Sequence, residues 1–242
     1  MTTLTKILVA TLLSLLTFSC NFDFNIVGVN GNGNVVTFER ELKGSFNQID
    51  ASRGLDVVLT QATYEQVSVE ADENLQEIIV TEIEGNTLKI TATENIASST
   101  SKTVYVSFDD LIGIDASSGS RVTSKNTITA EDFDIESSSG SDLNLSLQAE
   151  HLDCDSSSGS NLKLLGKATS VIARASSGSE ISAADLATES ANVKATSGAN
   201  ISINTSKKLT ASANSGGNIS YYGNPEVVNN NESVSGSIHS RQ

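Results

Sequence analysis

The sequence predicts an all-β protein that folds as a right-handed, single-stranded parallel β-helix with rungs of about 20 residues. Two observations predict this fold. The motif Ser-Ser-Gly-Ser recurs at nearly constant spacing through the second half of the chain, and apolar residues stand at every second position on both sides of it. Alternation with period two is typical of half-buried strands. A repeat of this length buries its apolar face only by stacking on copies of itself.

Each repeat contains one glycine that we expect to form a corner of the coil. From residue 119 onward these glycines lie 18 to 21 residues apart, and one earlier copy obeys the same frame. A corner requires a residue with positive φ, which glycine adopts at little cost. The neighbouring serines are expected to hydrogen-bond to the corner backbone and to one another between rungs. The predicted corner glycines are Gly54, Gly119, Gly140, Gly159, Gly178, Gly198, Gly216 and Gly236.

Alignment on these glycines indicates which side chains point into the core. Three residues after the glycine stand Val57, Val122, Leu143, Leu162, Ile181, Ile201 and Ile219. A leucine-rich repeat is the main competitor at this period, but its Leu/Asn consensus is absent. A β-propeller needs a period of about forty residues or more. A parallel β-helix is the fold that remains.

Residues 60–113 are less regular than the rest of the array. Pairs of apolar residues two positions apart mark strands in this segment, and Glu84-Gly85-Asn86 is a predicted turn between two of them. The interval between Gly54 and Gly119 leaves room for about three further rungs.

The first 34 residues predict export and a membrane anchor. Lys6 precedes a mostly apolar run over residues 7–18, which has the length of a signal-peptide core and is too short to span a bilayer. The cysteine that follows resembles the lipoprotein cleavage site of bacteria. We therefore expect a signal peptide over residues 1–19, a lipid on Cys20, a tether over residues 20–34 and the β-helix over residues 35–242. The alternative is a plain secretory signal with an unrelated cysteine.

A lipid on Cys20 would attach the protein to a membrane without a transmembrane helix. The expected location is the outer membrane, on the cell surface or on the periplasmic face. The formal net charge of −14 repels phosphates, so no nucleic-acid partner is expected.

Nothing in the sequence indicates nucleophilic catalysis. His151 and His239 are the only histidines, and no G-x-S-x-G motif is present. Cys154 has no cysteine partner once Cys20 carries lipid, and its inward position predicts a buried, inert thiol.

An outward row of charged side chains is the candidate functional site. Four residues before the glycines stand Asp115, Glu136, Asp155, Arg174 and Lys194, and two positions earlier stand Asp134 and Asp153. Stacked carboxylates repel one another unless a cation bridges them, and calcium accepts six to eight oxygens in loose geometry. We therefore expect a weak calcium site formed by Asp115, Glu136, Asp155, Asp134 and Asp153, and no other cofactor. The alternative is a solvated face with mobile counterions.

These features favour a non-catalytic envelope or surface lipoprotein that binds a glycan or another envelope component. The alternative is a polysaccharide lyase or hydrolase acting on acidic glycans, because such enzymes need paired carboxylates or a base with a bound cation. An envelope-sensing or regulatory lipoprotein is also compatible with the sequence.

Four segments of the chain resemble the head GIN domain family of auto-transporter adhesins, which is common in Bacteroidetes. They are residues 31–37 (GNGNVVT), 46–50 (FNQID), 54–57 (GLDV) and 217–225 (GNISYYGNP). The resemblance spans about residues 28–242. It implies a β-helix on an exported lipoprotein with an adhesin-like role, and it implies no catalytic or binding residue.

Overall fold

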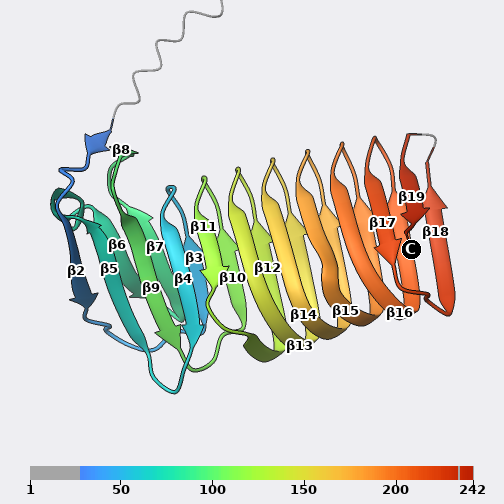
Figure 1. The fold of residues 1–242 in the computed structure, drawn as a ribbon, viewed down its shortest axis with the longest axis horizontal. Coiled ribbons are helices and arrows are strands. Elements are labelled where there is room, and N and C mark those ends of the chain that lie inside the picture. The colour runs from blue at the N-terminus through green and yellow to red at the C-terminus, as the bar shows by residue number, and fades with distance from the viewer. Residues whose placement is uncertain (1–27, 234, 242) are drawn as a thin grey trace, which may run out of the picture.

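The repeats stack into a β-solenoid of about 7 turns with rungs of roughly 19 residues in the computed structural model, which describes residues 28–233 and 235–241. Figure 1 shows the strands side by side along one long axis, from β2 at one end to β18 at the other. The predicted β-helix is confirmed.

The regular rungs pair in parallel and in register. Leu143, Leu162 and Ile181, for example, are direct neighbours on three successive rungs. The longest strands run 14 to 16 residues across a bend without interruption. The strands of this part are β10 (Gly113–Ala116), β11 (Arg121–Ser124), β12 (Ile128–Ser137), β13 (Asp142–Ser156), β14 (Asn161–Ala175), β15 (Glu180–Ala195), β16 (Asn200–Ala213), β17 (Asn218–Tyr222), β18 (Val227–Glu232) and β19 (Ser237–Ser240).

The core is one continuous column of stacked apolar side chains. Leu143, Leu162, Ile181 and Ile201 each have at most 2% of their surface exposed. Truncating a side chain in such a column to Ala typically costs about 2–5 kcal/mol, because the cavity cannot collapse fully. The stacking of rungs therefore supplies most of the stability, as a solenoid requires.

Each corner contains two consecutive residues with positive φ, whereas the sequence predicts only one, the glycine. Seven of the eight predicted corner glycines have a φ between 68° and 79°, and the residue before each also has a positive φ, between 50° and 60°. At Ser117–Ser120 the amide of Ser120 donates to the carbonyl of Ser117 at 3.1 Å. Two consecutive positive φ values closed by this bond are the features of a type I′ turn.

Gly236 is the exception and does not form the corner that we expected. Its φ is not positive. Ile238 pairs in register with Ile219, which sets Gly236 level with Gly217 rather than with Gly216. A Cβ atom on Gly236 or Gly217 would fall 2.2 or 2.3 Å from a carbonyl oxygen of the preceding rung. The inward isoleucines, not the glycine spacing, fix the register of the last rung.

The last serine of the motif is buried in four repeats, and the hydroxyls of Ser120, Ser160 and Ser179 bond to the neighbouring rung. The hydroxyl of Ser160 donates to the carbonyls of Ser157 and Ser137, at 2.8 and 3.0 Å. The hydroxyls of Ser156 and Ser160 lie 2.9 Å apart. The bond from Ser160 to Ser137 is a serine contact between rungs of the kind that the motif predicts, and the other two hold the corner itself.

The N-terminal part is built differently from the regular rungs. Its elements are β1 (Val29–Asn30), β2 (Val35–Arg40), β3 (Gln48–Ala51), β4 (Asp56–Gln61), β5 (Gln66–Asp72), the short 3₁₀ helix η1 (Glu73–Leu75), β6 (Ile79–Glu84), β7 (Thr87–Ala92), β8 (Ile96–Ser98) and β9 (Lys102–Phe108). Strands β3 and β4 stack in parallel on β10 and β11 on one side and on β7 and β9 on the other.

The three further rungs expected between Gly54 and Gly119 are therefore a wrong prediction. The segment between Gly54 and Gly119 forms only one more parallel layer, which consists of β7 and β9. Strands β5 and β6 of the same segment pair in antiparallel fashion. Because β3 and β4 are inserted between this layer and β10, the order of rungs in space differs from their order in the chain. The turn predicted at Glu84-Gly85-Asn86 is confirmed, and Gly85 has a φ of 67° between β6 and β7.

The expected tether boundary at residue 34 also lies too far along the chain. Residues 28–34 belong to the folded part, since β1 pairs in parallel with β8. The signal peptide, Cys20 and the remainder of the tether lie outside the described residues.

Buried Asp72 holds this first segment in place. A Cβ atom on Gly31 would lie 1.7 Å from its carboxylate, so only glycine fits there. Burial alone raises the pKa of Asp72, but backbone N–H groups of Thr100, Gly33 and Ser101 donate to the carboxylate and hold its pKa below the ordinary value.

Candidate functional site

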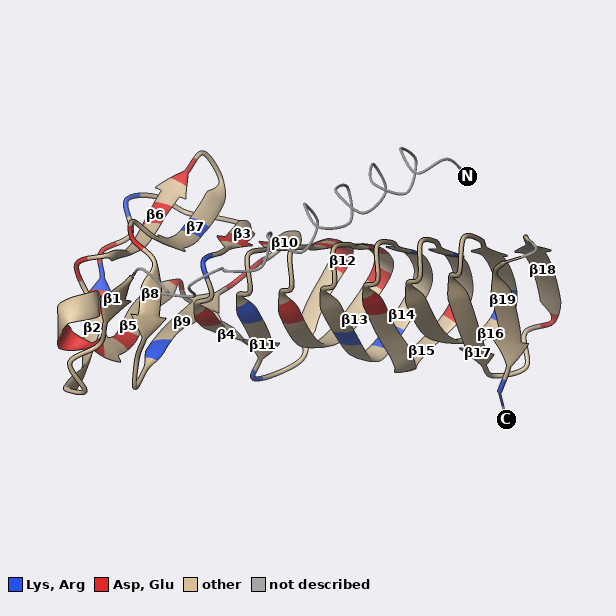
Figure 2. Cartoon of the chain, turned by 90° about the horizontal axis from the view of Figure 1, so that it is seen from above, with Lys and Arg blue, Asp and Glu red and all other residues tan. Residues whose placement is uncertain are grey.

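The predicted row of charged side chains runs across six rungs in one register. Strand pairing aligns Asp50, Asp115, Glu136, Asp155, Arg174 and Lys194 in that order. Neighbouring positions of such a row are separated by about 4.8 Å, the distance between hydrogen-bonded strands. The chain has 29 acidic and 15 basic residues, and Figure 2 shows both kinds distributed over the strands and loops of the solenoid.

A groove of about 690 Å³ follows this row. The charged side chains line it together with the first hydroxyl residue of each corner motif. These residues are Ser117, Ser138, Ser157, Ser176 and Thr196. The groove therefore combines charges and hydroxyl groups at rung spacing on a rigid wall.

The acidic end of the groove is electrostatically strained. Partial burial, together with the neighbouring carboxylates of Asp50 and Glu136, raises the pKa of Asp115. Among the described residues, no salt bridge is formed by Asp115 or Glu136. A carboxyl group perturbed in this way beside a hollow is a common feature of functional sites.

In the middle of the groove one arginine pairs with two carboxylates. Arg174 Nη1 donates to Asp153 Oδ1 at 2.7 Å and to Asp155 Oδ2 at 2.8 Å. The hydrogen bond to Asp153 is the main reason why the pKa of Arg174 is raised. Lys194, on the next rung, forms no salt bridge within the described part of the chain. The groove thus runs from unpaired carboxylates to an unpaired ammonium group.

The structure divides the predicted calcium ligands into two groups. Asp115, Asp134 and Glu136 line an adjoining hollow of about 320 Å³, whereas Asp153 and Asp155 are bound by Arg174. Within residues 28–233 and 235–241, no three His, Cys, Asp or Glu side chains lie close enough together to hold a metal ion. A calcium ion at the acidic end would need oxygens from a bound ligand, and the calcium site stays a prediction.

Asp50 is a member of the row that the sequence reasoning missed. It stands four residues before Gly54, the same offset that identifies Asp115, so the glycine frame contained the signal. Both Asp50 and Asp115 line the groove. The sequence favours a structural role for the corner serines, with a serine-rich ligand site as the alternative, and the structure places the first serine of four motifs in the lining of the groove.

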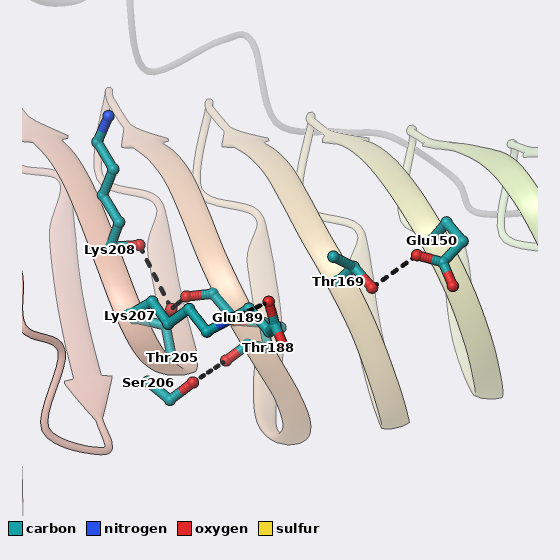
Figure 3. A network of polar contacts seen from close by, with 8 residues as sticks. All are labelled: Glu150, Thr169, Thr188, Glu189, Thr205, Ser206, Lys207 and Lys208. Carbon is teal, nitrogen blue, oxygen red and sulfur yellow. Dashed lines mark hydrogen bonds and ion pairs between the residues drawn. The ribbon is translucent and has the colours of Figure 1, made fainter.

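A second groove, of about 310 Å³, differs because its polar groups already bind one another. Thr169 donates to Glu150 at 2.8 Å, and Lys207 pairs with Glu189 at 2.6 Å (Figure 3). Ser206 donates to the carbonyl of Thr188 in the same network. These contacts tie neighbouring rungs together and leave few groups for a ligand, so the first groove is the stronger candidate.

The reactive side chains Cys154 and His151 lie in different surroundings, one in the core and one on the surface. Burial raises the pKa of the Cys154 thiol, in agreement with an inert core residue. His151 Nδ1 lies 2.8 Å from the hydroxyl of Ser170, and this pair is exposed on the surface rather than enclosed in a pocket. No helix in the described part of the chain is long and apolar enough to cross a bilayer.

Solved structures with the same architecture come from Bacteroides and Parabacteroides species. A "putative adhesin" from Bacteroides fragilis superposes with a TM-score of 0.83 at 21% identity, over 88% of this chain and 100% of its own. A "putative lipid binding protein" from Parabacteroides distasonis gives 0.70 at 21% identity, over 88% and 99%. A "putative adhesin" from Parabacteroides merdae gives 0.67 at 18% identity, over 88% and 99%. At these identities the likeness shows the fold alone.

Among curated proteins, none matches the chain in sequence. The sequence profile of one family matches residues 45–225, which include every residue of the charged row. That family is described as "Putative auto-transporter adhesin, head GIN domain". The resemblance found in the sequence is thereby confirmed, and the chain belongs to this head GIN domain family.

Proposed function

We propose that this protein is an exported, lipid-anchored, adhesin-like surface protein that binds its target in the charged groove without catalysing a reaction. The observation that carries the proposal is the row of three carboxylates, Asp50, Asp115 and Glu136, held at rung spacing along a groove of about 690 Å³, in which Asp115 and Glu136 form no salt bridge among the described residues. Folding has placed like charges side by side where a ligand can neutralise them, and no packing requirement of the core explains their presence.

The charges indicate the class of ligand. A protonated amine would relieve the repulsion that raises the pKa of Asp115 and would exchange water for charge-assisted hydrogen bonds. Hydroxyl groups of Ser117 and Ser138 line the groove beside the carboxylates and can bond to a polar chain. The ligand is therefore an extended chain that carries amines, such as an amino-sugar polymer or a lysine-rich peptide segment.

Other ligands fit the groove less well. One structural relative is described as lipid binding, but charged and hydroxyl side chains line most of this groove. An acidic glycan would be repelled by the carboxylates unless calcium bridged the two. A lyase or hydrolase acting on such a glycan would meet the same repulsion.

Titration of the purified full chain with hexalysine and with a chitosan oligosaccharide tests the proposal. We expect both amine probes to bind, with an affinity that falls as salt is added. The double variant Asp115→Asn, Glu136→Gln should bind about tenfold more weakly, since two charge contacts are removed.

The matched control is Glu131→Gln, Glu180→Gln, which removes two exposed charges outside the groove and should bind as the parent does. Equal affinities for parent and groove variant would refute the proposed site. Binding of polygalacturonate only in the presence of calcium would replace the amine ligand by an acidic one. Release of reducing ends from that polymer would establish the enzymatic alternative.

A further inference from the structure

The two ends of the solenoid differ in how their strand edges are protected. At the N-terminal end, β2 and β6 are antiparallel edge strands, and each forms a paired register with one neighbour only. Strand β2 carries Glu39 and Arg40, and β6 carries Glu82 and Glu84. Charges and hairpins on an edge strand are common protections against pairing with another chain.

The C-terminal end has a less protected edge. Strand β18 forms a paired register with β16 alone among the described residues, and its last residue, Glu232, is the one charged residue of the strand. An edge strand presents a row of unpaired N–H and C=O groups on its open side. In Figure 1, β18 closes the stack at the end opposite β2.

The core column is also uncovered at this end. Val228 pairs in register with Leu209, whose side chain is fully buried because a further rung covers it. Val228 is 39% exposed and Val227 is 49% exposed. A terminal repeat normally hides the end of the core behind a polar cap, and β18 does so only in part, with three asparagines.

We infer that two copies of this chain pair end to end through β18, as antiparallel strands related by a two-fold axis. The segment suits a second copy of itself because each asparagine amide is both a donor and an acceptor, and a two-fold interface brings the same residues together. The net charge of −14 opposes association of the long acidic sides, whereas residues 227–231 are uncharged. Since the N-terminal end is protected, the contact closes as a dimer and does not extend into a fibre.

The geometry gives the pair a function that rests on the proposed lipid anchor. Strand β1, the first element of the described chain, lies at the end of the solenoid opposite β18 (Figure 2). Two copies joined at β18 therefore place the starts of their described chains at the two far ends of the dimer. Such a pair bridges two membranes, and the partner of an adhesin-like protein on one cell is the same protein on the next.

Sedimentation equilibrium of the full chain in mild detergent tests the pairing. We expect a shift toward twice the monomer mass with a dissociation constant on the order of 10–100 µM, as is typical of small interfaces. Asn229→Lys, Asn231→Lys should weaken pairing at least tenfold, and so should Asn229→Glu, Asn231→Glu, because like charges then meet across the axis. An equimolar mixture of the two variants should pair again.

The matched control is Val35→Lys, Thr37→Lys on β2, which should pair as the parent does. Unchanged melting temperatures show that the β18 variants fold. A parent that stays monomeric at about 1 mM, or a Lys variant that pairs normally, overturns the inference. Vesicles carrying the lipidated Lys variant should cluster only with vesicles carrying the Glu variant. The groove variant Asp115→Asn, Glu136→Gln should still pair, which separates this test from that of the ligand groove.

Discussion

Arg174 reaches from its own rung to the preceding one, where its Nη1 atom lies 2.7 Å from Oδ1 of Asp153. The same nitrogen lies 2.8 Å from Asp155 Oδ2, so one cation joins two carboxylates that would otherwise repel each other. We expect Arg174→Gln to lower the free energy of unfolding by about 0.5–1 kcal/mol, the range for exposed ion pairs. Urea denaturation at low and high salt measures the change, which should shrink with salt. Lys167→Gln, which removes an exposed charge without a salt bridge, should be neutral, and an equal loss in both variants would contradict the account.

Asp115 has the opposite effect on stability. Its pKa is raised in the folded state, so the fold binds this proton more readily than the unfolded chain does. The stability that this proton supplies is present at low pH and is lost as the pH rises through the folded pKa. We therefore expect Asp115→Asn to stabilise the fold at pH 7 by about 0.5 kcal/mol, the scale of a like-charge pair on neighbouring strands.

The gain from Asp115→Asn should disappear below about pH 4, near the ordinary pKa of an aspartate. Thermal melts at a series of pH values check this, with Glu131→Gln as a control. A destabilised Asp115→Asn at pH 7 would show that the carboxylate has a stabilising partner.

The corner conformation predicts opposite effects at adjacent residues. Gly159 has a φ of 71° and open space where a Cβ atom would lie, so Gly159→Val costs about 1–3 kcal/mol through backbone strain rather than through a clash. Ser158 has a φ of 53°, and Ser158→Asn creates the Asn-Gly pair that type I′ turns favour. We expect that change to add about 0.5 kcal/mol. Guanidinium denaturation measures both, with Lys163→Val on a strand as the neutral control. A destabilising Ser158→Asn would argue against the type I′ geometry.

The anchor is tested by Cys20→Ala. If Cys20 carries the lipid, the variant should leave the membrane fraction or accumulate with its signal peptide uncleaved. Mass spectrometry of the N-terminus of the parent should find an acylated cysteine. An unmodified N-terminus together with unchanged membrane association would contradict the lipoprotein assignment.

The regular rungs could be predicted from sequence because every constraint on them is local. The same corner conformation and the same alternation of apolar and polar residues recur at a nearly constant spacing. The position of one repeat therefore predicts the position of the next. The N-terminal part could not be predicted in the same way. Antiparallel strands such as β5 have the same alternation as a rung, and their pairing with β2 and β9 depends on contacts far apart in the chain.

The two errors within the repeats have a common cause. Gly236 was matched to the corner glycines because it is a glycine that follows a serine. The inward residue Ile238 stands two residues after Gly236, whereas the matching inward residue stands three residues after the glycine in the other repeats, and this difference marks the shift in register. The row omitted Asp50 because its repeat keeps only one serine of the motif, Ser52, although the offset of Asp50 from Gly54 is the standard one. In both cases the alternation of inward and outward side chains determines how the rungs align. The identity of the corner residues is a less reliable guide.

Attachment of intact cells to a chitosan-coated surface tests the central claim, a surface-exposed groove that binds amines. Cells that produce the parent protein should attach well above cells that lack it. The variant Asp115→Asn, Glu136→Gln should reduce attachment to the level of cells without the protein, while Glu131→Gln, Glu180→Gln should leave it unchanged. Equal surface amounts must be verified by antibody labelling of intact cells. Attachment of the groove variant at the level of the parent would contradict the claim that this groove is the binding site.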